Sequence, residues 1–118
     1  MTIALGWLVK VNPDELPRVV NVPQGVTKIY DYVFSACHNI DEVILPEGVV
    51  FLGTRVFGEF DGATLIKLTL PDSLSSVSAD TVCLLPNIKE IVVGKGLLEV
   101  GKHRLHLIIL ILNFLYMI

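Results

Sequence analysis

A sequence unit that recurs about every 23 residues predicts a solenoid fold, in which short strands and turns stack one repeat on the next. Each unit carries a proline or glycine mark, and successive marks are 23, 25 and 23 residues apart, at Pro23, Pro46, Pro71 and Gly94. Apolar residues surround every mark at the same five distances: three and one before it, and three, six and eleven after it. No single unit can bury so many apolar side chains alone, so stacked units must share one core.

Each unit is expected to begin with a short strand that ends at the mark. In the best-preserved copy, Val43 and Leu45 alternate with Ile44, which predicts the first two side chains inside and the third outside. Pro46 has no N–H group and therefore ends the strand without leaving a donor unpaired. Residues that favour turns follow each mark, as Gln24-Gly25, Glu47-Gly48, Asp72-Ser73 and Lys95-Gly96.

A second extended piece and one large ring are expected to complete each unit. In the best-preserved copy the chain returns through Val49 and Leu52, and Phe57 then inserts its ring, as Phe34 does one unit earlier. Two extra residues lie within 58–64, where glycine and aspartate suggest an outward loop, and serines replace the usual framework in the third unit. The chain should be mostly strand and turn, with little helix outside the C-terminal tail.

The ends of the chain depart from this pattern. Trp7 is expected to lie over the open end of the stack, although its segment could equally remain from a lost upstream region. Three parts are predicted: a degenerate N-terminal coil or cap at 1–17, a solenoid of about four units with the last incomplete at 18–104, and a hydrophobic tail at 105–118.

The composition indicates one core-rich domain without a nucleic-acid surface. The chain has 118 residues, of which 53% are hydrophobic and only 18% charged, and its net charge is −3. Up to Val100 there are seven basic and twelve acidic residues, which gives 7 − 12 = −5. Nucleic-acid phosphates require clustered Lys and Arg, so an acidic body without a basic stripe argues against that class of partner.

No residue set predicts catalysis, a cofactor or a metal site. Cys37 and Cys83 fall two units apart, at a separation of about 10 Å that exceeds the reach of a disulfide, so free buried thiols are expected. His38 follows Cys37 directly, but adjacent side chains normally point apart and a nucleophile needs an oriented base. His103 and His106 have metal-like spacing but no third ligand nearby.

The best-preserved unit carries a family resemblance. It reads Ile40-x-x-Val43-x-Leu45-Pro46-x-x-Val49-x-x-Leu52-Gly53-x-x-Val56-Phe57, and the unit before it contributes Val33-Phe34-x-x-Cys37. This pattern resembles the BspA-like (treponemal-class) leucine-rich repeats, over about Val20 to Gly101. Departures are valine at the usual alanine, at Val33 and Val56, and Phe60 for cysteine.

The resemblance implies a non-enzymatic protein-interaction module. Members look like surface antigens and adhesins that bind host, matrix or cell-surface proteins, and they supply no fixed site residues. The alternatives are a truncated fragment of a longer repeat protein without independent function, or a soluble intracellular scaffold. A cell-surface location follows from the resemblance, whereas the absence of a signal-peptide pattern in residues 1–17 leaves a cytoplasmic location open.

The outward side of the first strand of each unit is the candidate protein-binding face. Its positions lie two and four residues before each mark, at Val19, Asn21, Glu42, Ile44, Lys67, Thr69, Glu90 and Val92. This face mixes apolar and charged residues and lacks the Trp, Tyr and Arg that usually dominate binding energy. The alternative is a sheet surface that only faces solvent.

The C-terminal tail is strongly apolar, in 12 of its 14 residues (105–118). As a helix it would reach only about 21 Å of a roughly 30 Å hydrocarbon core, so membrane contact is not the favoured interpretation. A lid over the last coil, a short membrane anchor, and a product of truncation or a frame change all remain open.

Fractionation of the full-length chain against a version that ends at Lys102 separates these interpretations. A membrane anchor predicts that only the full-length chain enters the membrane fraction. If both versions stay in solution as monomers, the anchor is excluded.

Overall fold

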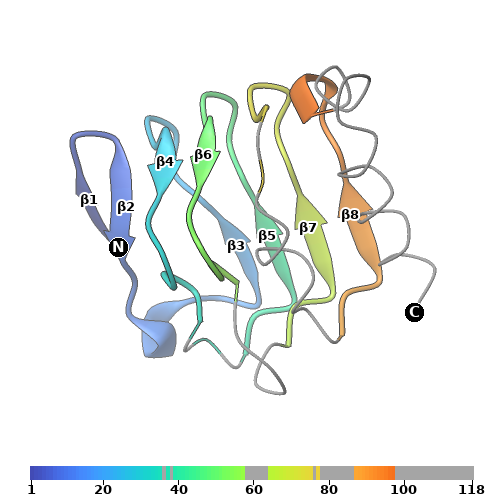
Figure 1. Cartoon of the computed structure of the whole chain (residues 1–118). Helices are drawn as coiled ribbons and strands as arrows, with labels where there is room; N and C mark the ends of the chain where they lie inside the picture. The colour runs from blue at the N-terminus through green and yellow to red at the C-terminus, as the bar shows by residue number, and fades with distance from the viewer. Residues whose placement is uncertain (36, 38, 58–63, 76, 78–86, 98–118) are drawn as a thin grey trace.

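The computed structural model shows a mostly β-strand chain folded into two four-stranded sheets (Figure 1). It describes every residue except 36, 38, 58–63, 76, 78–86 and 98–118. Sheet A has the strand order β1-β2-β4-β6, and sheet B has the order β3-β5-β7-β8. Predictions that concern Cys83, the three histidines, the loop within 58–63 and the tail at 105–118 lie outside the described residues.

The strands are short, and the chain alternates between the two sheets from β3 to β7. Sheet A contains β1 (Thr2–Ala4), β2 (Trp7–Lys10), β4 (Lys28–Ile29) and β6 (Phe51–Leu52). Sheet B contains β3 (Val19–Asn21), β5 (Glu42–Ile44), β7 (Lys67–Thr69) and β8 (Glu90–Val92). A 3-10 turn, η1 (Pro13–Glu15), is capped by the Asn12 side chain, which accepts the Asp14 N–H.

Parallel pairing places the same position of successive repeats side by side. In sheet B, Val20 pairs with Val43, Val43 with Leu68, and Leu68 with Ile91. These four side chains, three residues before each mark, are buried as the repeat predicts. Leu8, Ile29 and Leu52 form the corresponding buried row of sheet A.

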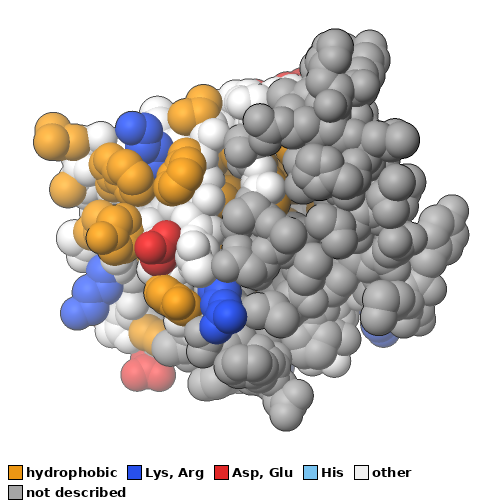
Figure 2. Space-filling view, viewed as in Figure 1, with side chains coloured by type: hydrophobic (Ala, Val, Ile, Leu, Met, Phe, Trp, Pro, Cys, Tyr) orange, Lys and Arg blue, Asp and Glu red, His pale blue; other side chains and the backbone are white. Residues whose placement is uncertain are grey.

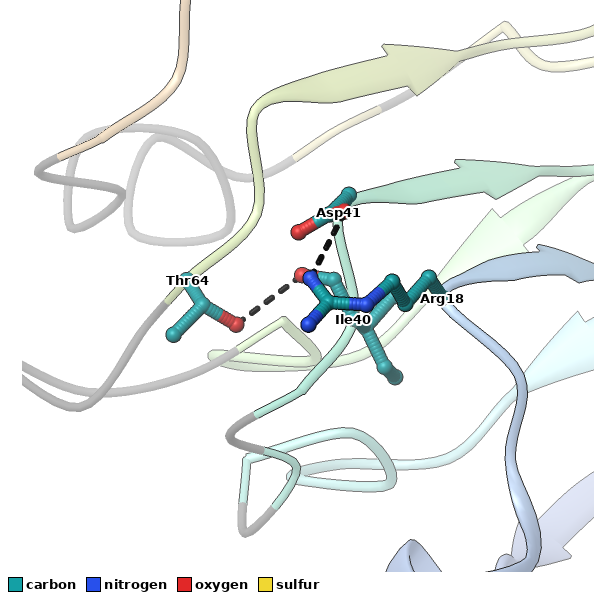
Figure 3. Close-up of polar contacts among 4 residues, drawn as sticks. All are labelled: Arg18, Ile40, Asp41 and Thr64. Carbon is teal, nitrogen blue, oxygen red and sulfur yellow. Dashed lines mark hydrogen bonds and ion pairs between the residues drawn. The ribbon is translucent and has the colours of Figure 1, made fainter.

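The two-residue insertion leaves the register of sheet B unchanged. Strands β3 and β5 pair residues 23 apart, and so do β7 and β8, whereas β5 and β7 pair residues 25 apart. Thr64, which follows the insertion, returns to the stack by donating its hydroxyl to the Ile40 carbonyl at 2.9 Å (Figure 3). The extra residues therefore fall between Phe57 and Thr64.

The expected turn forms after three of the four marks and ties one unit to the next. The N–H of the third residue after the mark donates to the proline carbonyl in all three, at Val26, Val49 and Leu74. Gly25 and Gly48 occupy positive φ angles of 97° and 106°, which glycine adopts without steric penalty. In the fourth unit, residues 95–97 are helical instead.

A glycine replaces proline as the fourth mark because the neighbouring turn leaves no room. A Cβ atom at Gly94 would overlap the backbone of Pro71 and Asp72. The Asp72 carboxylate accepts the Lys95 N–H at 2.8 Å, and the Asp72 carbonyl accepts the Gly96 N–H at 2.9 Å. The close approach of the Pro71 and Asp72 backbone therefore requires glycine at position 94.

Trp7 does not lie over the end of the stack, and that expectation was wrong. It begins β2, which pairs in parallel with β4, so the N-terminal segment adds a strand in register with the repeats. The Trp7 ring packs sideways on the outer face of sheet A, against Tyr30 and Phe51. Strand β1 then pairs with β2 in the antiparallel direction and forms the sheet edge.

Two aromatic rings stack in the core. The rings of Phe34 and Phe57 are nearly parallel, with an interplanar angle of 6° and centroids 5.9 Å apart, and both are buried. Each ring comes from the same position of successive repeats, so a large side chain of one unit rests on that of the next.

Replacing Phe57 with alanine is expected to lower the free energy of unfolding by roughly 3–5 kcal/mol, because it removes half of the stack and leaves a cavity. Urea denaturation measures this loss. The matched control is Phe51→Ala, whose ring is 43% exposed and whose loss should be about 1 kcal/mol. A Phe57→Ala loss below that of the control would contradict the assigned register.

Candidate protein-binding surfaces

The eight residues of the candidate binding face lie in two rows across the outer side of sheet B. Strand pairing aligns one residue of every strand in each row. The first row, here called the charge row, is Val19, Glu42, Lys67 and Glu90, and the second, the apolar row, is Asn21, Ile44, Thr69 and Val92. The edge strands β3 and β8 carry the exposed members, and the central strands carry the half-buried ones.

The charge row alternates in sign. The Lys67 ammonium lies between two carboxylates, 4.0 Å from that of Glu42 and 3.7 Å from that of Glu90. A further pair joins Arg18 to Asp41 at 3.3 Å beside the row (Figure 3). The Lys67 and Glu90 side chains are 38% and 58% exposed, so these pairs contribute little to stability. Their charges remain accessible to a partner.

The apolar row differs in character from the charge row. Three of its four side chains, Ile44, Thr69 and Val92, are β-branched and stand on neighbouring strands. Val92 is 40% exposed, and Val19 at the opposite edge of the sheet is 44% exposed. A row that contains Ile44, Thr69 and Val92 on three neighbouring strands, beside an alternating charge row, can contact another protein over several strands.

Sheet A carries an aromatic cluster that the sequence interpretation missed. The Trp7 ring makes edge-on contacts with Tyr30 and Phe51, with centroid distances of 5.8 Å in both cases. Tyr30 is 53% exposed and Phe51 is 43% exposed. The repeat itself indicates these outward positions. The sixth residue after a mark, Ile29 or Leu52, is buried, so the residues on either side of it in the chain point outward. Phe51 is the fifth residue after its mark and Tyr30 is the seventh after its own.

A lysine stands inside this cluster. Lys28 pairs with Trp7 on one side and Phe51 on the other, and its ammonium lies 5.1 Å from the centre of the Trp7 ring. The distance fits a cation–π contact. In the part of the chain that the structure describes, no carboxylate pairs with Lys28.

Further exposed apolar side chains surround the cluster. Leu5 at the β1–β2 turn is 100% exposed, and Val9, Tyr32 and Val50 are each more than a third exposed. Figure 2 shows orange side chains gathered over the part of the surface formed by sheet A, with basic and acidic groups among them. Gatherings of this kind commonly mark interaction sites on protein surfaces.

The described residues hold no arrangement suited to metal chemistry. They include no group of three or more His, Cys, Asp or Glu side chains that could bind a metal ion. Cys37 is free and buried, and desolvation raises the pKa of its thiol. The same part of the chain also contains no helix whose length and hydropathy would suit a membrane crossing.

A family comparison matches most of the chain. The BspA type leucine-rich repeat region matches residues 17–111, in 6 copies. The chain belongs to this family. Comparisons with curated proteins and with solved structures give no match. Leucine-rich repeats of this kind typically serve as interaction modules rather than as enzymes, and the stacked parallel strands are consistent with that use.

The buried Cys37 thiol is expected to resist modification, since its raised pKa disfavours the reactive thiolate. In a Cys83→Ser variant, a disulfide reagent at mildly alkaline pH should modify Cys37 about a hundredfold more slowly in the folded chain than in urea. Equal rates in the two states would show that the thiol is accessible.

Proposed function

We propose that this chain is a non-enzymatic protein-interaction module, built as a leucine-rich repeat solenoid, whose sheet B face contacts the partner. The finer proposal is a surface-antigen or adhesin role, with a host, matrix or cell-surface protein as partner. We also propose the division into a cap at 1–17, the solenoid at 18–104 and a tail at 105–118.

The observation that best supports this function is the register of sheet B. Eight outward residues align in two straight rows over four strands, because the repeat gives each strand the same inward and outward positions. The backbone in such a sheet is held by pairing on both sides in β5 and β7, so binding would require little ordering of the surface.

The charge row favours a partner whose own charges alternate in the opposite order: positive, negative, positive. A row that reads negative, positive, negative from Glu42 to Glu90 presents two carboxylates around one ammonium. Complementary charges increase the association rate and select the partner's alignment more than they raise affinity. The apolar row beside them supplies area that can be removed from water.

Reversal of the charge row tests this function. The Glu42→Lys/Glu90→Lys variant should weaken binding of a partner by about tenfold, because all charges of the row become positive. A panel of purified matrix and cell-surface proteins, passed over the immobilised full-length chain, provides candidate partners for surface plasmon resonance.

The matched control carries the same change in net charge away from sheet B. Asp14→Lys/Glu15→Lys alters the exposed turn η1 and should leave the affinity unchanged within about twofold. Binding that falls equally in both variants, or no binding across the panel, would contradict the proposal.

A further inference from the structure

We propose that the outer face of sheet A is a second, separate binding surface, which takes an extended acidic peptide segment with large apolar side chains beside its carboxylates. The aromatic cluster of Trp7, Tyr30 and Phe51 would hold the apolar side chain, and Lys28 would pair with the carboxylate. This surface is independent of the charge and apolar rows, because the two lie on different sheets.

The composition of the cluster is that of a binding anchor. Tryptophan and tyrosine are the residue types that most often dominate interface energies. Here the Trp7 ring on β2 lies 5.8 Å, between ring centroids, from each of two further rings: Tyr30, directly after β4, and Phe51 on β6. Because β4 lies between β2 and β6, the Trp7 ring reaches across a whole strand to contact Phe51. Tyr30 and Phe51 remain 53% and 43% exposed above the sheet.

The charge at the centre selects an acidic partner. The Lys28 ammonium contacts a ring rather than a carboxylate, and its side chain is half-buried between the strands that carry Trp7 and Phe51. One carboxylate oxygen of Asp31, three residues further on, accepts the Thr54 N–H at 2.8 Å. A carboxylate that reached Lys28 would thus gain an ion pair without breaking one, in surroundings less polar than water.

The shape and edges of the face suit an extended segment. The outward residues of β2, β4 and β6 form a row across the sheet, with neighbouring strands about 4.8 Å apart. Val9, two residues after Trp7 on β2, is 38% exposed and extends the apolar area of this face. Alternate residues of an extended peptide point to one side, so an apolar and an acidic side chain two positions apart can face the same surface.

The single tryptophan supplies a specific readout. Trp7 is the only tryptophan of the chain, so its fluorescence reports on sheet A alone. Selection of a random displayed peptide library against the full-length chain should enrich peptides with Asp or Glu close to Leu, Phe or Trp. Titration of a selected peptide that lacks tryptophan should shift the Trp7 emission to shorter wavelength, because the peptide covers the ring.

Variants of the surface and matched controls complete the test. Lys28→Glu and Phe51→Ser should each weaken peptide binding by about tenfold or more. The controls are Lys89→Glu, the same charge reversal, and Ile66→Ser, a comparable apolar-to-serine change, both at exposed positions outside sheet A; they should stay within about twofold of the parent. Lys28→Met keeps the apolar stem and removes the charge, so it should abolish the preference for acidic peptides even if Lys28→Glu folds poorly.

Several outcomes would overturn this inference. The first is that no peptide is enriched, and the second is that the enriched peptides bind without moving the Trp7 emission or without loss in Lys28→Met. A shift caused by phosphatidylcholine vesicles instead of peptides would assign the face to a membrane surface. Self-association that Phe51→Ser abolishes would assign it to a second copy of the chain. None of these outcomes bears on sheet B, whose test uses other variants.

Discussion

The parallel alignment of buried residues between neighbouring repeats is the constraint on which the rest of the structure depends. Val43 lies between Val20 and Leu68 in adjacent strands, and each of the three is buried. Because side chains in a strand alternate in direction, a slip of one residue would turn this row outward and bring Glu42 or Ile44 into the core. The burial of one row therefore determines both the stacking of the units and the residues that remain outside.

The two outer faces created in this way have different chemistry. Sheet B presents small β-branched groups next to charges that already pair with one another, as Lys67 does with Glu42 and Glu90. Sheet A presents large rings, with the ammonium of Lys28 over one of them. A repeat architecture can separate surfaces in this manner because the inward positions are common to all units, whereas each outward position is free to differ.

The sequence predicted the features that follow from repetition, and the structure departs from it where repetition ends. The buried positions, the turns after three marks and the stacked pair Phe34 and Phe57 recur at fixed distances, so counting was enough to find them. The placement of Trp7 was wrong because no proline mark precedes β2, which is instead the second strand of the β1–β2 hairpin. The aromatic cluster was not predicted because the expected binding face lay on the strand before each mark, whereas Phe51 lies on the other sheet.

The register of sheet B is unchanged across the two-residue insertion, which indicates where a repeat chain of this kind can accept additional residues. The connection between Phe57 and Thr64 is longer than its counterpart one unit earlier, yet β5 and β7 pair as closely as the strands of equal units do. Loop length in this position is thermodynamically inexpensive, since closure entropy grows only slowly with chain length. The same point in the coil is consequently a natural place for a lineage to acquire new sequence, or for an experimenter to insert an epitope, without remodelling the body that carries it.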